Sequence, residues 1–352
     1  MKSPGRAARE PQVMTRSMDE DRITGWLGAR TPGGSRVLVG IGDDAAVLRP
    51  SREHTVVTTD MLVEGVDFRR DWTTPRALGR KAVAVNMSDL AAMGARPLFF
   101  TVALALPPDI PFRWVRELHR GLIDPASARG AHLVGGDLSR SEAGGVISIT
   151  AIGESIGRRV IRRSGGRAGD LLYVTGTLGR SAAGLALLRA GRLRGRTAAE
   201  REALRAHHLP EARCAEGVYL AIHGFARAMM DLSDGLSTDL PRLCAASGVD
   251  AEIDPGLVPL FPAARRWGCD PLALALDGGE DYELLFAVPK ARAPRLEKIW
   301  PPRLAPITRI GRLVAGSGKV WLAKDGSRRP LPRGGYDHFL SSVRPPTAPS
   351  VP

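Results

Sequence analysis

The sequence predicts an α/β protein of two domains in tandem, in which strand-like and helix-like segments alternate along the chain. Its 352 residues exceed one domain of ordinary size and suit two. Apolar residues make up 43% and charged residues 25%, as in a typical globular chain. An Arg- and Gly-rich stretch at 158–169 separates two alternating runs. We therefore expect α/β domains at 22–155 and 156–341, with disordered polar tails at 1–21 and 342–352.

The first domain contains the clearest helix of the chain. Thr74 can cap this helix, Pro75 suits its first position, and Gly94 can end it. Apolar residues recur along it mostly every three or four positions, which indicates one buried face. A second helix is expected to open at Asp109 and Pro111. Strands are expected at 37–39, 56–59, 99–106, 131–134 and 146–153.

The second domain repeats the alternation. Strands are expected at 171–175, at a segment entering Asp231, and at 282–288, with helices ending at Ala190 and starting after Leu236. The dipeptide Asp325-Gly326 predicts a hairpin turn. The Arg-rich piece at 189–205 is interpreted as a solvated helix end or a loop.

The net charge of +13 raises the question of nucleic acid as a partner. Only six of the 50 basic residues are lysine, and the arginines are scattered rather than interleaved with aromatic residues. No helix-turn-helix, zinc-finger or RNP-like pattern stands out. A basic surface also steers anionic substrates. A nucleic-acid-binding protein is therefore kept only as an alternative from a different class, and no dedicated nucleic-acid partner is expected.

The cysteines and the apolar segments indicate the cellular compartment in which the protein is expected. Cys214, Cys244 and Cys269 form no spaced pair, which argues against a disulfide framework and a structural zinc site, so we expect buried thiols. The longest apolar run, at 98–106, is far shorter than the roughly 20 residues that span a bilayer. The first 21 residues hold no signal-like apolar stretch. The sequence predicts a cytoplasmic protein without a membrane partner.

The informative feature is a set of six acidic segments placed in glycine-rich turns or at the ends of apolar strands. They are Gly42 to Asp44, Thr58 to Asp60, Asn86 to Asp89, Gly135 to Asp137, Asp231 to Gly235 and Gly278 to Asp281. One such Asp is ordinarily a turn residue, but six are difficult to explain as turns alone. Grouped carboxylates need a counter-charge, and Mg²⁺ prefers oxygen ligands and binds few carboxylates together with substrate phosphates. Without His or Cys clusters, zinc is not expected.

Spacing adds detail to two of these segments. On a strand, Thr58 and Asp60 point to one face and Thr59 to the other. Asn86 and Asp89 share one face of the predicted helix, and a solvated helix face is the bland interpretation of that pair.

Familiar nucleotide and nucleophile signatures are absent. Gly318-Lys319 is followed by Val320, so it is no P-loop, and neither a kinase H-R-D nor a D-F-G occurs. No Ser-His-Asp or Cys-His set has supporting context. The histidines His119, His207 and His208 are expected on the surface.

Taken in order, the motifs resemble those of the thiamine-monophosphate kinase family, between about residues 37 and 339. They are GIGDDAAVL, TTDMLVEGVDF, KAVAVNMSDLAAMGARP, GGDLSRS, IRRSGGRAGDLLYVTGTLGRSAAGLALL, MDLSDGLSTDL, DGGEDYELLF and GGYDHF. The superfamily also includes aminoimidazole ribonucleotide synthetase, selenophosphate synthetase and a hydrogenase maturation protein. The resemblance implies a homodimer paired through the N-terminal domains. It implies direct, in-line transfer of the γ-phosphate of ATP to thiamine monophosphate, with ATP as co-substrate and several Mg²⁺ ions.

The resemblance also assigns roles to positions of this sequence. The implied metal ligands are Asp44, Thr58, Thr59, Asp60, Asp89, Asp137, Asp231 and Asp234. The implied ATP contacts are Gly136, Asp137, Arg163 and Ser233. The implied substrate contacts are Asp67, Glu280 and Tyr336. No catalytic acid or base is assigned, because the acceptor is already a charged phosphate and transfer asks mainly for positioning and charge neutralisation.

Two positions depart from the family pattern. Asp67 stands where the family often has histidine, which puts one substrate contact in question, and Leu138 replaces a common hydroxyl residue. Other enzymes of the superfamily stay open as alternatives. Selenophosphate synthetase typically carries a reactive Cys near its N-terminus, whereas the first cysteine here is Cys214. A purine-precursor synthetase is less easily excluded, although GGEDYEL and GGYDHF favour the thiamine interpretation.

Overall fold

The structure, a computed structural model, describes residues 20–31, 33–41, 45–50, 52–157 and 159–336. Its first unit is built on a four-stranded sheet in the order β3-β6-β4-β5. The strands are β3 (Thr55–Val63), β4 (Arg96–Leu106), β5 (His132–Arg140) and β6 (Val146–Glu154). Only β4 and β5 pair in parallel. A small hairpin of β1 (Val37–Val39) and β2 (Val47–Leu48) precedes this sheet.

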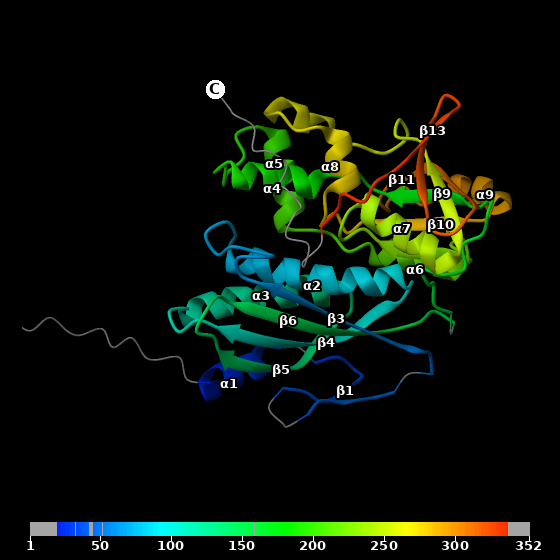
Figure 1. Ribbon diagram of the computed structural model, residues 1–352. Coiled ribbons are helices and arrows are strands. Elements are labelled where there is room, and N and C mark those ends of the chain that lie inside the picture. The colour runs from blue at the N-terminus through cyan, green and yellow to red at the C-terminus, as the bar shows by residue number, and fades with distance from the viewer. Residues whose placement is uncertain (1–19, 32, 42–44, 51, 158, 337–352) are drawn as a thin grey trace, which may run out of the picture.

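Helices cover one face of this sheet (Figure 1). They are α2 (Pro75–Ala92) and α3 (Phe112–Ser127), and α1 (Glu20–Arg30) packs on α3 through Trp26. The predicted cap of α2 is confirmed, because the Thr74 side chain accepts a hydrogen bond from the Ala77 amide and Pro75 opens the helix. Asp109 does not cap α3 but pairs with Arg70 at 3.2 Å.

The second unit is a seven-stranded sheet in the order β13-β12-β9-β11-β7-β10-β8. Its strands are β7 (Leu171–Thr175), β8 (Ala228–Asp231), β9 (Val249–Ile253), β10 (Leu284–Val288), β11 (Ile307–Ala315), β12 (Val320–Lys324) and β13 (Ser327–Pro330). Its helices are α4 (Arg180–Arg189), α5 (Ala198–His208), α6 (Cys214–His223), α7 (Leu236–Ser247), α8 (Pro271–Asp277) and α9 (Ala293–Ile299), with 3₁₀ turns η1 (Pro262–Trp267) and η2 (Lys290–Arg292). Asp325 and Gly326 both have positive φ between β12 and β13, as the predicted hairpin requires.

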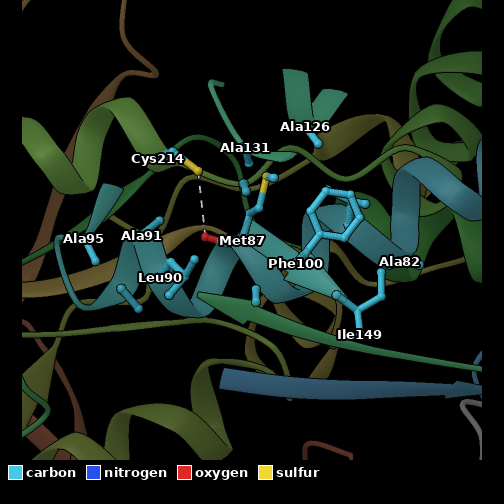
Figure 2. Packing of buried hydrophobic residues seen from close by; sticks show 14 of the residues in the cluster. Ala82, Met87, Leu90, Ala91, Ala95, Phe100, Ala126, Ala131, Ile149 and Cys214 are labelled. Atoms are coloured by element: carbon cyan, nitrogen blue, oxygen red, sulfur yellow. Dashed lines mark hydrogen bonds between the residues drawn. The ribbon is translucent and has the colours of Figure 1, made fainter. Parts of the chain in front are cut away.

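Helix α2 lies between the two units (Figure 1), and this position explains its composition. Thirteen of its 18 residues are buried, on more than the one face that the sequence pattern predicts. Leu90 and Ala91 belong to a core cluster that includes residues of both units (Figure 2). The Cys214 thiol of α6 donates to the Met87 carbonyl of α2 at 3.7 Å. The site can therefore draw side chains from both units across one rigid helix.

Several expectations need correction. The Arg-rich piece at 189–205 was expected to be solvated, but much of it is α5, opened by a capping box between Thr197 and Glu200. Ala203 and Leu204 are buried in a core cluster with residues of α4, which fixes the helix. The last predicted strand begins at Leu284 rather than at residue 282, because Tyr282 has a positive φ.

The histidine prediction was wrong for two of three residues. His119 and His207 are buried, and burial lowers the pKa of His119 to about 4. Cys214 and Cys244 are buried as expected, and Cys269 is half-buried. Across the described part of the chain, no helix has the length and apolar character needed to cross a membrane.

Candidate active site

Three aspartates from different elements meet beside α2. Asp60 comes from β3, Asp89 from α2, and Asp231 from the end of β8 in the second unit. The Thr58 hydroxyl donates to Asp89 Oδ2 at 2.5 Å, and the Ser88 hydroxyl donates to Asp231 Oδ2 at 2.6 Å. Neighbouring hydroxyls thus orient two of the carboxylates.

Asn86 explains why this part of α2 is not a solvated face. The side chain is buried, and its Oδ1 accepts a hydrogen bond from the Asp60 amide at 3.0 Å. Asn86 Nδ2 donates back to the Ala82 carbonyl at 3.0 Å. The residue therefore fixes the register between α2 and β3 at the level of the carboxylates.

The three carboxylates lack a basic partner among the described residues. Burial, followed by the negative charge of Asp89, raises the pKa of Asp60 to about 6. The same two causes raise the pKa of Asp231 to about 7, although the positive charge of Arg163 opposes the rise. Uncompensated carboxylate charge in a half-buried place is unfavourable, and a hard divalent cation is the usual remedy.

These residues fit Mg²⁺ by the chemistry of their donors, which are carboxylate and hydroxyl oxygens. In the described part of the chain, no group of three or more Asp, Glu, His or Cys side chains is arranged to hold a metal ion by itself. That agrees with the habit of Mg²⁺ to bind through one or two carboxylates, waters and substrate phosphates.

Asp234 differs from the other three aspartates. Its carboxylate pairs with Arg242 at 2.5 Å, and its backbone amide donates to Asp239 Oδ2 at 2.9 Å. It still lies near the cluster, because its charge contributes to the raised pKa of Asp60. The positive charge of Arg242 therefore already compensates part of the negative charge of Asp234.

One predicted metal ligand, Asp137, lies apart from this cluster, and the Thr59 side chain points away from it, as its place on the strand predicts. The Thr59 hydroxyl donates to the Ile149 carbonyl at 3.0 Å. Asp137 is exposed on β5, with β4 and β6 between it and β3. Three strand spacings amount to roughly 14 Å. Asp44 lies outside the described residues.

The predicted ATP contacts lie in different places: Gly136 is on β5, whereas Arg163 and Ser233 lie near Asp231 and Glu280. A Cβ on Gly136 would lie 2.1 Å from the Val102 carbonyl oxygen, so the close approach of β5 to β4 already requires glycine there. Arg163 lies near enough to Asp231 to affect its pKa. The Ser233 carbonyl accepts a hydrogen bond from the Glu280 amide at 2.7 Å.

The three predicted substrate contacts lie near enough to one another for their charges to interact. The pKa of Tyr336 is raised by partial burial and then by the negative charges of Asp67, Glu280 and Asp234. The Tyr336 amide donates to the Asp234 carbonyl at 3.1 Å. Asp67 Oδ2 accepts from the Val63 amide at 2.8 Å, which closes its own loop. Fold and charge thus bring these side chains into one neighbourhood.

Sequence reasoning missed two residues there, Lys81 and His207. Lys81 Nζ lies 2.5 Å from Glu280 Oε1, and His207 Nδ1 lies 3.1 Å from Glu280 Oε2. These contacts hold the pKa of Glu280 well below its usual range, against the effect of burial. The available signal was a lysine that directly precedes the apolar run 82–85 of α2.

Hydrogen bonds of the neighbouring residues Asp281 and Glu283 fix the turn that carries Glu280. Asp281 accepts hydrogen bonds from the Gly179 amide at 2.5 Å and the Ser181 amide at 3.2 Å, at the start of α4. Buried Glu283 accepts two hydrogen bonds from Arg213, each 2.6 Å long. Such a bidentate pair is strong and directional.

The chain matches two family models: "AIR synthase related protein, N-terminal domain" over residues 42–155, and the corresponding C-terminal domain over residues 167–322. It is 40% identical over 312 residues to the thiamine-monophosphate kinase of Escherichia coli strain K12, covering 87% of this chain and 93% of that protein.

Solved structures agree with these matches. A thiamine-monophosphate kinase from Stenotrophomonas maltophilia superposes with a TM-score of 0.76 at 36% identity, covering 87% of this chain and 96% of that one. A structure described as AaThiL complexed with AMPPCP and TMP superposes with a TM-score of 0.73 at 36% identity, covering 91% and 95%.

Proposed function

The chain belongs to the AIR synthase related family and, within it, to the thiamine-monophosphate kinases, which are phosphotransferases, and from this premise we propose its reaction. It transfers the γ-phosphate of ATP to thiamine monophosphate and yields thiamine diphosphate and ADP. The relatives that support this share most of their length with the chain, and one of them was solved with AMPPCP and TMP.

The observation that carries the proposal is the group of carboxylates from both units that form no ion pair with any described basic residue. Asp60, Asp89 and Asp231 would hold Mg²⁺, together with the other ligands implied by the resemblance. When bound, Mg²⁺ supplies the positive charge that neutralises phosphate oxygens and aligns the reacting groups. Thr58 and Ser88 orient the carboxylates through the hydrogen bonds described above.

The other residues of the site bind and orient. Arg163 and Ser233 are the proposed contacts to ATP, next to Asp231. Asp67, Glu280 and Tyr336 are the proposed contacts to thiamine monophosphate. The acceptor phosphate is already charged, so transfer asks for positioning rather than for a base. None of the described residues is set up as an activated nucleophile, and we propose direct transfer without a phosphoenzyme.

We also propose a homodimer that pairs through the four-stranded sheet. The face of this sheet opposite α2 exposes apolar side chains, among them Val57 and Met61 at 60% and 56%. Strands β3 and β5 are unpaired edges within the described chain, and unpaired edges readily add a strand. Placing β5 of a second copy along β3 would bring the second copy's Asp137 to within about one strand spacing, roughly 5 Å, of β3.

An acceptor comparison tests the proposed function. Purified protein with ATP and excess Mg²⁺ is offered thiamine monophosphate or thiamine, and products are separated by mass. We expect thiamine diphosphate from the monophosphate, little product from thiamine, and no turnover with excess chelator. Efficient phosphorylation of thiamine, or turnover that survives the chelator, would refute the proposal.

A further inference from the structure

We propose that Lys81 is a positioning residue that sets the acceptor end of the site, by holding the Glu280 carboxylate and the Asp67 loop at a fixed distance from the metal-binding carboxylates. The inference rests on the proposed function, because it takes Glu280 and Asp67 as contacts of thiamine monophosphate.

The surroundings of Lys81 show what its charge does. The residue is 3% exposed, and its Nζ lies 2.5 Å from Glu280 Oε1. It also donates to the Asp67 backbone carbonyl at 3.5 Å. A buried ammonium group is costly unless it is paired, so these two contacts determine where the side chain lies. One amine thus joins a loop of the first unit to a turn of the second.

Glu280 is held by contacts at both carboxylate oxygens and at its backbone amide. Its other carboxylate oxygen faces His207, and its amide donates to the Ser233 carbonyl at 2.7 Å. Its φ is +64°, in the left-handed region that non-glycine residues rarely adopt. Such strain persists only where the surroundings impose it. Within the part of the chain that the structure describes, Lys81 ties this strained turn to the first unit through an ion pair.

The position of Lys81 on α2 relates it to the metal-binding side. Ser88, which donates to Asp231, lies seven residues further along, so both side chains project from nearly the same face. Seven residues of helix span roughly 10 Å. The helix therefore fixes the spacing between the turn that holds Glu280 and the strand end that holds Asp231. Lys81 acts through Glu280 and Asp67 and is not placed on the reacting atoms.

The test uses the full chain with Lys81→Met, which keeps most of the unbranched side chain and removes its charged end. A charged hydrogen bond lost from the acceptor pocket corresponds to about a 10- to 100-fold rise in KM for thiamine monophosphate. We expect KM for ATP to change by less than about threefold. Lys298→Met, on an exposed position of α9, is the control and should leave both KM values unchanged.

Coupling to Glu280 separates a positioning role from a general loss of stability. Glu280→Gln should itself raise KM for thiamine monophosphate, and adding Lys81→Met to it should raise KM by less than about threefold more. Independent effects that multiply in the double variant would overturn the proposal. So would an unchanged KM for thiamine monophosphate in Lys81→Met, or an equal rise in KM for ATP.

If Lys81→Met does not fold, Lys81→Arg tests the positioning role instead. It keeps the buried charge but moves the Glu280 carboxylate, because guanidinium is longer and planar. We expect native melting behaviour and a several-fold higher KM for thiamine monophosphate alone, and an unchanged KM would overturn the proposal. If the proposed function itself were wrong, wild-type protein would form no thiamine diphosphate, so the two failures are distinguishable.

Discussion

At the scale of single residues, Asp231 combines deep burial with a carboxylate that forms no ion pair among the described residues and that Arg163 compensates only in part. Asp231→Asn should lower kcat by about a hundredfold or more, because Mg²⁺ contributes several kcal/mol to such reactions. The same change relieves repulsion with Asp89, so the melting temperature in metal-free buffer should rise. Calorimetry and steady-state kinetics on one preparation check both results.

Asp234 provides the contrast for that prediction. Asp234→Asn should also reduce activity, but it breaks the ion pair with Arg242, so its metal-free melting temperature should fall. A lower melting temperature in Asp231→Asn, matching that of Asp234→Asn, would show that the Asp231 charge is already compensated.

The raised pKa values of Asp60 and Asp231 predict how stability depends on pH. Both groups bind their proton more tightly in the folded state than in the unfolded state, where the pKa is about 3.9. Below about pH 4 both groups are protonated in both states, so they do not change the free energy of unfolding. Between about pH 4 and pH 7 they lower the free energy of unfolding progressively, and above about pH 7 the loss stays constant. Mg²⁺ should consequently raise the melting temperature more at pH 8 than at pH 5.

Comparison with Asp231→Asn isolates this effect from the other titrating groups. The difference in melting temperature between the variant and wild type, both metal-free, should be larger at pH 8 than at pH 5. A difference that does not depend on pH would contradict the assignment of a raised pKa to Asp231.

Asp67 can be tested with two substitutions that the structure distinguishes. Its carboxylate closes a loop by accepting from the Val63 amide, a role that Asn can keep. If its charge also contacts thiamine monophosphate, both Asp67→Asn and Asp67→Ala should raise KM by about 10-fold or more. Wild-type KM in Asp67→Asn would show that the charge of Asp67 does not contact thiamine monophosphate.

At the scale of elements, the packing of α2 against α6 is tight enough to test. A Cβ on Gly217 of α6 would lie 2.1 Å from the Ala91 carbonyl oxygen. Gly217→Ala should therefore destabilise the protein by about 1–3 kcal/mol in urea unfolding. Gly25→Ala, in α1 with open space around the new methyl, should instead stabilise it by about 0.5–1 kcal/mol. Equal effects of the two changes would mean that the units are not packed through α2.

The elements show what the sequence can and cannot predict. Thr74 and Pro75 predicted the start of α2, because capping depends on residues next to one another. The burial of α2 on several faces was not predicted, since a helix between two layers loses a clear single-sided pattern. The start of α5 was missed although Thr197 and Glu200 form a capping box, because the surrounding arginines suggested solvent.

At the scale of the whole molecule, the tandem α/β architecture followed from the alternation of strands and helices. The make-up of the site did not. Asp60, Asp89 and Asp231 were predicted together, whereas the separation of Asp137 depends on the strand order, which the sequence pattern does not contain. Lys81 was missed because its partner Glu280 is almost 200 residues away.

The proposed dimer predicts complementation between two inactive variants. Asp60→Asn and Asp137→Asn should each be inactive alone. If one site takes Asp60 from one copy and Asp137 from the other, half of the dimers formed after co-expression are mixed, and each has one intact site. Activity should then recover to about a quarter of the wild-type value. No recovery, with dimers confirmed by light scattering, would place both residues in the same copy's site.

The most direct test of the central claim follows the transferred group itself. The protein is incubated with Mg²⁺, thiamine monophosphate and ATP labelled with ¹⁸O in its γ-phosphate, and the products are analysed by mass spectrometry. The account predicts thiamine diphosphate with the label in its terminal phosphate, formed in equal amount with ADP. Labelled free phosphate without thiamine diphosphate, or AMP in place of ADP, would contradict it.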